Sequence, residues 1–194
     1  MSISVDRTSL ARRLPGDLAM WFFILAELTV FAILILAFAV AQWLNPELFR
    51  ESRAALDSSI GLALTLSLLT SGLLAALAVE QVRLAQPQRG AALLLGALLV
   101  SGVYVALKLN EYGHLSSLGL GLEHNTFFTL YWILTGFHFL HVLLGLVILG
   151  WMAERCRRRA YSAQDCAGLE SGVLYWHMVD MVWVLLFPLV YVIN

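Results

Sequence analysis

The sequence carries little charge for its length. Asp, Glu, Lys and Arg make up 13% of the 194 residues, whereas soluble globular domains average about 25%. Hydrophobic residues account for 60%, and the mean hydropathy is +0.81. This composition excludes an ordinary soluble domain and indicates a polytopic membrane protein.

Cysteine is also scarce. Cys156 and Cys166 are the two cysteines, and their spacing predicts neither a zinc site nor a disulfide framework, so we expect two free thiols. The chain contains no C-x-x-C-H motif for haem attachment. No small-residue cleavage site follows a short apolar run near residue 1, so we expect the first apolar span to be retained.

Five apolar runs each reach the roughly 20 residues that a transmembrane helix needs. The expected spans are about 18–44, 58–79, 91–110, 126–152 and 171–194. The sequence therefore predicts an all-α membrane protein, with an N-terminal arm (residues 1–17) before a single five-helix transmembrane domain (residues 18–194).

The segments between the spans are expected to be polar loops. One is predicted over residues 47–57, a tight turn over 80–90, and a third loop that includes Glu111, Tyr112 and His114. Lys108, beside that loop, is expected to reach the membrane interface with its long side chain. In the last span, Pro188 is expected to kink the helix.

Basic residues are divided unequally between the two ends of the spans. Nine lie in the N-terminal arm and in the second and fourth loops, against three on the other side. Because cytoplasmic loops are enriched in Lys and Arg, this predicts a cytoplasmic N-terminus and a periplasmic C-terminus in the bacterial inner membrane. The nine are Arg7, Arg12, Arg13, Arg83, Arg89, Arg155, Arg157, Arg158 and Arg159, and the three are Arg50, Arg53 and Lys108.

Away from the ends of the spans, five acidic or histidine residues lie within the apolar segments: Glu27, His138, His141, His177 and Asp180. A rise of about 1.5 Å per residue places Glu27, the fourth-span histidines and Asp180 in the cytoplasmic half of the membrane. Isolated charges there are costly, so pairs of carboxylates and imidazoles are favoured. We expect Glu27 to meet His138 or His141. Asp180 is expected to meet His177 or a helix of a partner.

Other interpretations of these residues are open. The histidines could form hydrogen bonds between helices, contact lipid headgroups or bind haem, for which His138 with His177 is the plausible pair. Glu27 could act as a functional carboxylate or as a structural partner of a histidine. The arginines of the fourth loop (Arg155, Arg157, Arg158, Arg159) first signal topology and are also candidates for binding lipid headgroups. Trp21, Trp43, Trp151, Trp176 and Tyr191 are expected mainly as interfacial anchors.

Four segments resemble subunit III of the haem-copper oxidases. WFFILAELTVFA around Glu27 resembles the helix with the family's buried glutamate, and KLNEYGH resembles its Glu-Tyr element. FFTLYWILTGFHFLHVLLG and LESGVLYWHMVDMVWVLLFPLVY resemble its TGFHGLHV helix and its final helix. The chain departs from the pattern at Phe139, where the family usually has glycine, and at Leu169, where it often has phenylalanine.

The resemblance implies an accessory subunit with no catalytic residue, metal or cofactor of its own. Such a subunit flanks the catalytic subunit, which holds haem and metal, binds structural phospholipid and supports proton uptake. Glu27, His138, His141, His177 and Asp180 would form its polar interior, with Glu111 and Tyr112 at the outer end. The five-helix length is similar to bacterial short forms, especially the subunit III-like protein that accompanies nitric oxide reductases. No nucleic-acid partner is expected.

Two further functions fit an apolar chain with intramembrane ionisable residues. A b-type cytochrome subunit would bind haem through His138 or His177. A small proton-coupled transporter would use Glu27 and Asp180, but the two halves of the sequence show no convincing repeat. The catalytic subunit of an oxidase needs more histidines than the five present here.

Overall fold

The structure is a computed structural model, and it describes residues 18–193. Within that range, five helices are long and apolar enough to cross a membrane. They are α1 (Leu18–Leu44), α3 (Ser58–Arg83), α4 (Pro87–Ser117), α5 (Thr126–Arg157) and α6 (Ala167–Phe187). A short helix, α2 (Pro46–Arg53), follows α1, and a π-helical turn, η1 (Pro188–Val192), ends the described chain. The predicted all-α bundle with five spans is confirmed.

The helix ends follow local sequence signals. Asn45-Pro46 ends α1 and starts α2, because proline suits the first helical position. The Asp57 and Asn125 side chains cap α3 and α5 by accepting bonds from the Ser59 and Phe128 amides at 2.8 and 3.0 Å. Pro188 starts the π-helical turn.

Two of the expected loops are wrong. Residues 46–53 form α2, whose apolar side buries Phe49 in the core. The helix α4 continues to Ser117, so Glu111, Tyr112 and His114 are helical. Lys108 and Glu111 of KLNEYGH are buried against other helices, so these charged residues do not mark a loop.

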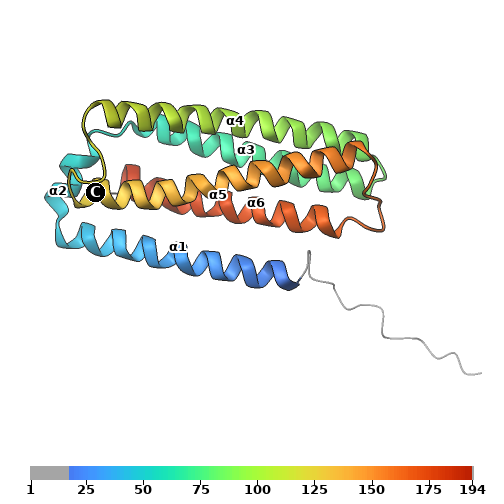
Figure 1. Cartoon of the computed structure of the whole chain (residues 1–194), viewed down its shortest axis with the longest axis horizontal. Coiled ribbons are helices and arrows are strands. Elements are labelled where there is room, and N and C mark those ends of the chain that lie inside the picture. Colours follow the sequence, from blue (N-terminus) through green and yellow to red (C-terminus); the bar gives the residue numbers. More distant parts are fainter. Residues whose placement is uncertain (1–17, 194) are drawn as a thin grey trace, which may run out of the picture.

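The core is formed by α3, α4, α5 and α6, and α1 packs on α5 and α6 at one side (Figure 1). The buried residues of α1 are Ile24, Phe31 and Phe38, a spacing of seven that makes one narrow seam. Elsewhere α5 and α6 approach closely at Gly145. The glycine leaves room for the Trp176 ring, which a Cβ atom at this position would overlap.

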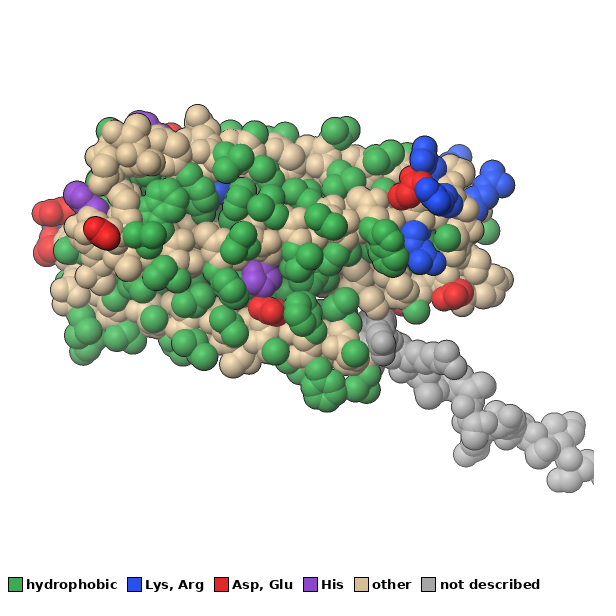
Figure 2. Space-filling model, in the orientation of Figure 1, with side chains coloured by type: hydrophobic (Ala, Val, Ile, Leu, Met, Phe, Trp, Pro, Cys, Tyr) green, Lys and Arg blue, Asp and Glu red, His purple; other side chains and the backbone are tan. Residues whose placement is uncertain are grey.

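Large apolar side chains are exposed along all five long helices. In Figure 2 they cover the middle of the bundle, whereas Lys and Arg gather at one end. That end, formed where α3 and α5 finish and α4 begins, is called the basic end below. The α2 end is the opposite end, where the described chain also stops (Figure 1). An apolar belt between polar ends is the pattern of a bilayer-spanning protein.

Candidate functional site

Glu27 of α1 pairs with His141 of α5. Glu27 Oε2 lies 3.0 Å from His141 Nε2, and His141 Nδ1 lies 2.8 Å from the carbonyl oxygen of Phe137. Since a carbonyl can only accept, Nδ1 carries a hydrogen. One further proton must then lie between Nε2 and Oε2. Of the two partners expected for Glu27, the structure brings His141 into contact.

The pair reaches the surface of the bundle. The Glu27 and His141 side chains are 22% and 11% exposed, and Figure 2 shows an acidic and a histidine side chain together in the middle of the apolar face. The Phe31 ring packs edge-on against the imidazole, with 5.1 Å between centroids. Behind the pair, the Tyr175 hydroxyl donates to the carbonyl of His141 at 3.1 Å. The pair is therefore exposed at one edge and contacts Phe31 and the Phe137 carbonyl within the bundle.

His177 and Asp180 form a second pair, one turn apart on α6. His177 Nδ1 lies 3.0 Å from Asp180 Oδ2. Asp180 is buried, while the His177 side chain is 38% exposed and lines two pockets, one between α3 and α6 and one between α1 and α6. A Cβ atom at Gly72 would overlap Asp180 Oδ2, so glycine there makes room for the carboxylate. The expected contact of Asp180 with His177 is confirmed.

His138 is fully buried and makes no hydrogen bond through either ring nitrogen within residues 18–193. Its ring packs against Trp183 and Tyr104, with centroids at 5.1 and 6.2 Å. The expectation that His138 shares in the pairing of polar groups is wrong, because aromatic side chains surround its ring. The other histidine of the expected haem pair, His177, bonds Asp180 through Nδ1.

The largest polar cluster surrounds Lys108 near the α2 end. Lys108 Nζ donates to Glu111 Oε2 at 3.1 Å, to Tyr131 Oη at 3.1 Å and to Tyr191 Oη at 2.9 Å. Tyr131 and Tyr191 in turn donate to Glu111 Oε1 at 3.0 and 2.7 Å. Lys108 has no exposed surface, so the prediction that it reaches the membrane interface is wrong.

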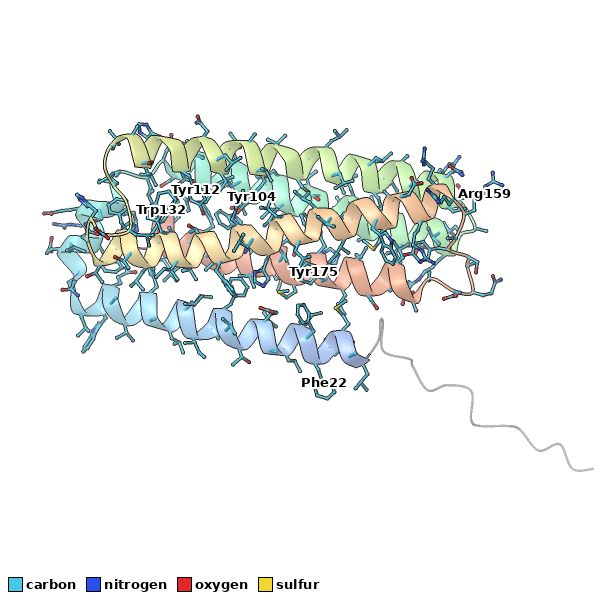
Figure 3. The ribbon with its side chains drawn as sticks, in the orientation of Figure 1. Phe22, Tyr104, Tyr112, Trp132, Arg159 and Tyr175 are labelled. Atoms are coloured by element: carbon cyan, nitrogen blue, oxygen red, sulfur yellow. The ribbon has the colours of Figure 1, made fainter. Side chains whose placement is uncertain are left out.

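Every hydrogen of the Lys108 ammonium thus has an acceptor, and Glu111 balances its charge. A buried ion pair is tolerated when its remaining bonds are satisfied in this way. The K-x-x-E spacing is a sequence signal for the pair. The roles of Tyr131 and Tyr191 had no such signal, because tyrosine in an apolar span also suits an interface. Tyr112 lies beside the cluster, donates to Thr135 Oγ1 at 3.0 Å and packs against the Trp132 ring with 4.6 Å between centroids (Figure 3).

The end of the chain is tied to three other helices. Arg53 Nε donates to the carbonyl of Val190 at 2.9 Å, and Ser58 donates to that of Tyr191 at 3.1 Å. Gln42 donates to the carbonyl of Ile193 at 3.1 Å. These donors satisfy carbonyl groups that a helix terminus leaves without partners. Burial lowers the pKa of Arg53 from its usual value, although an arginine stays charged in proteins.

The arginines of the fourth loop differ in their surroundings. Arg157 and Arg158 both bond Glu154, at 2.8 and 2.6 Å. The Arg155 guanidinium lies between the Trp151 and Tyr161 rings, 5.0 and 5.2 Å from their centroids. Arg159 lies at the end of the bundle, where α5 finishes and α4 begins (Figure 3).

The aromatic residues expected at the interfaces differ in exposure, and Trp21 is half-buried. Trp43 and Trp151 are 80% and 56% exposed, as anchors would be. Trp176 and Tyr191 are buried in the core, so their predicted anchoring role is wrong. The Trp176 ring packs against Gly145 of α5, and the Tyr191 hydroxyl bonds Lys108 and Glu111. Within residues 18–193, no group of three or more His, Cys, Asp or Glu side chains is placed to hold a metal ion.

Arg7, Arg12 and Arg13, three of the basic residues that predicted the orientation in the membrane, lie outside the described residues. Arg83, Arg89 and the four arginines from Arg155 to Arg159 lie at the basic end, where α1 begins (Figures 1 and 2). Lys108 is not an interfacial residue, so it no longer counts for the opposite side.

Comparison with known proteins gives a family match over almost the whole chain. Residues 13–194 match the family model described as cytochrome c oxidase subunit III. Cytochrome c oxidase subunit 3 of Thermostichus vulcanus is 35% identical over 96 residues, which cover 49% of this chain and 46% of that protein. The same subunit of a Synechocystis strain is 41% identical over 92 residues, covering 47% and 38%. The chain thus spans less than half the length of these two relatives.

A third relative is matched over nearly its full length. The probable quinol oxidase subunit 3 of Staphylococcus aureus is 27% identical over 179 residues, which cover 92% of this chain and 89% of that protein. The match therefore includes both the Glu27 helix and the final helix.

Proposed function

The chain belongs to the cytochrome c oxidase subunit III family, is a multi-pass membrane protein, and, we propose, serves as the non-catalytic subunit III of a haem-copper cytochrome c or quinol oxidase complex. In this proposal the catalytic subunit holds the haem and metal, and this chain binds structural phospholipid. It holds a proton close to its surface for uptake by its partner. The observation that carries the proposal is the Glu27–His141 pair, which combines a shared proton with an exposed edge.

The pair can hold a proton in apolar surroundings at little electrostatic cost. With Nδ1 bonded to the Phe137 carbonyl, the proton lies either on Glu27, beside a neutral imidazole, or on Nε2, beside a carboxylate. Both arrangements have zero net charge, which avoids the cost of an isolated charge in the membrane. Loss of the proton leaves a net negative charge, so a nearby water chain or partner group that supplies protons would refill the pair quickly.

We place the basic end in the cytoplasm, following the bias of Lys and Arg toward cytoplasmic loops. The N-terminus of α1 is then cytoplasmic and the C-terminus periplasmic. Glu27 is nine residues past Leu18, about 14 Å into the span at 1.5 Å per residue. A proton on the pair would therefore come from the cytoplasmic side.

Purification of the chain from its own membrane tests the proposed assembly. We expect a larger subunit to copurify, with the absorbance of haem, and we expect the separated chain to be colourless. Haem absorbance that stays with the separated chain and disappears in a His138→Ala variant would support a b-type cytochrome subunit instead. Recovery of the chain alone, without haem, in a mild detergent that preserves known oxidase complexes would contradict the proposal.

Association with a nitric oxide reductase is a separate and finer proposal. It is supported by the five-span length alone, whereas the relatives described above are named as oxidase subunits. Oxygen and nitric oxide consumption by the purified complex separate the two cases. Oxygen reduction without nitric oxide reduction would exclude the finer proposal and leave the first in place.

A further inference from the structure

One ring nitrogen of His177 has no hydrogen-bond partner within residues 18–193. Nδ1 bonds Asp180, and no described group meets Nε2. A Cβ atom at Gly72 would lie 3.4 Å from Nδ1 and from Cε1, so α3 covers this side of the ring. The side chain as a whole stays accessible, and a molecule from outside the chain can therefore reach the ring.

The pair with Asp180 makes Nε2 a hydrogen-bond donor. An isolated charge in the membrane is costly, which favours the two arrangements of the pair that have no net charge. In one, Asp180 is protonated and donates to Nδ1, and the hydrogen of the neutral ring is on Nε2. In the other, Asp180 is ionised and both ring nitrogens carry hydrogens. Nε2 donates in both arrangements, so it needs an acceptor.

The pocket between α1 and α6 offers a place for that acceptor. It has a volume of about 290 Å³, near the lower end of the usual size of small-molecule sites, roughly 300 Å³. Apart from His177, its lining residues are hydrophobic, and they include Trp21, Met178 and Met181. Methionine sulfur atoms make favourable contacts with aromatic rings. The pocket thus suits a flat, apolar ring that carries an oxygen acceptor.

The depth of His177 separates it from the charged groups at the basic end. It follows Glu170 by seven residues, about 10 Å along α6 at 1.5 Å per residue. Glu170 is bonded to Arg83 at 2.8 Å, and neither of these two residues lines the pocket between α1 and α6. The pocket therefore offers no arginine or lysine to a phosphate, and an acceptor bound there is expected to be uncharged.

We propose that the pocket between α1 and α6 binds the ring of a membrane quinone, with one carbonyl oxygen accepting from His177 Nε2. A quinone combines a flat apolar ring with uncharged carbonyl acceptors. Met181 and Leu185 line the pocket and are exposed on the apolar surface, so an isoprenoid tail can remain in the bilayer. The inference does not depend on the proposed function, because the separated chain can be tested without an oxidase partner.

Binding to the full chain in detergent tests the site. The probes are a menaquinone with a short isoprenoid tail and the naphthalene with the same substituents, which lacks both carbonyl oxygens. Comparing the ratio of their affinities between variants cancels their partition into the micelle. Asparagine at position 177 keeps a donor for Asp180 but has none at the position of Nε2. We expect His177→Asn to lower the preference for the menaquinone by about threefold to tenfold, the loss expected for one hydrogen bond.

The matched control is His114→Asn, which removes an exposed histidine near the end of α4, far along the chain from the pocket. It should leave the preference for the menaquinone unchanged. An unchanged preference in His177→Asn, or an equal loss in the control, would overturn the proposal.

A second variant changes the apolar wall of the pocket. Met181 is exposed, so Met181→Trp fills the pocket without disturbing the core, and it should weaken the binding of both probes. Val147→Trp places the same ring at an exposed position of α5 outside the pocket and should not. Equal binding by these two variants would contradict the proposed location.

Competition identifies the source of the carbonyl group. An acyl ester of a glycerolipid also offers an uncharged carbonyl oxygen, but it has no ring. Displacement of the bound menaquinone by other short-tail quinones, and not by a short-chain diacylglycerol, supports the proposal. Displacement by the diacylglycerol at the same concentrations would assign the pocket to an acyl ester and overturn it.

Discussion

Lys108 Nζ lies 2.9 Å from Tyr191 Oη, so a buried ammonium in the middle of the chain is bound to its last turn. Tyr191 also donates to Glu111 at 2.7 Å. The C-terminal turn is therefore part of the same network as α4 and α5. Together with the bond from Arg53 to the Val190 carbonyl, this closes the bundle at the α2 end.

A Tyr191→Phe substitution should destabilise the protein. It removes a hydroxyl that accepts from Lys108 and donates to Glu111, and bonds to charged groups contribute about 1.5 to 3 kcal/mol each. Denaturant unfolding in detergent micelles measures the loss. Tyr112→Phe is the control, since its bond to Thr135 joins neutral groups and is worth about 0.5 to 1.5 kcal/mol. A smaller effect at Tyr191 than at Tyr112 would contradict the network described here.

Lys108 and Glu111 should behave as a coupled pair. Lys108→Met leaves a buried carboxylate without its counter-charge and should cost about 3 to 5 kcal/mol. Adding Glu111→Gln should recover part of that loss, because the remaining cluster is neutral. The double-mutant cycle measures the coupling, and strict additivity of the two substitutions would show that the ion pair contributes nothing.

Arg53 should protect the C-terminus from digestion. Arg53→Met removes donors to the carbonyls of Leu189 and Val190, so the last turn should open more often. Carboxypeptidase digestion of the purified chain, followed by mass spectrometry, measures the rate. Arg50→Met is the control, as Arg50 is exposed and bonds only Glu47 among the described residues. Equal digestion of the two variants would argue against the contact.

Cys166 should react slowly with alkylating reagents near neutral pH. Burial, followed by its bond to Glu170, raises the pKa of the Cys166 thiol, and the thiolate is the reactive form. In a Cys156→Ala background, the alkylation rate should therefore rise at a higher pH than for a free thiol. Glu170→Gln should shift that rise to lower pH, and no shift would mean that the carboxylate does not act on the thiol.

The sequence predicted the structure best where placing a residue type in the membrane has a high free-energy cost. The apolar runs predicted the five spans. The cost of an isolated charge in the membrane predicted that Glu27 would meet a histidine, and that Asp180 would meet His177 or a helix of a partner. The surroundings of Lys108 could not be predicted in the same way. A long basic side chain near a helix end suits either the interface or a buried carboxylate, and the choice depends on how far α4 continues.

The surroundings of His138 could not be predicted either. A polar ring in an apolar span predicts a hydrogen-bond partner, but the His138 ring is instead in contact with Phe31, Tyr104 and Trp183 from three other helices. These contacts depend on how segments far apart in the sequence pack together.

The central claim is that the Glu27–His141 pair holds a proton for the partner subunit, and sustained turnover of Glu27→Gln complexes tests it most directly. Glutamine keeps the shape and can bond His141 but cannot release a proton. Glu47→Gln, at the exposed α2 end, is the matched control. We expect both variants to assemble fully, with a lower rate or a shorter active lifetime for Glu27→Gln alone. An assembled Glu27→Gln complex with the rate and lifetime of the control would contradict the claim and leave the pair a structural contact.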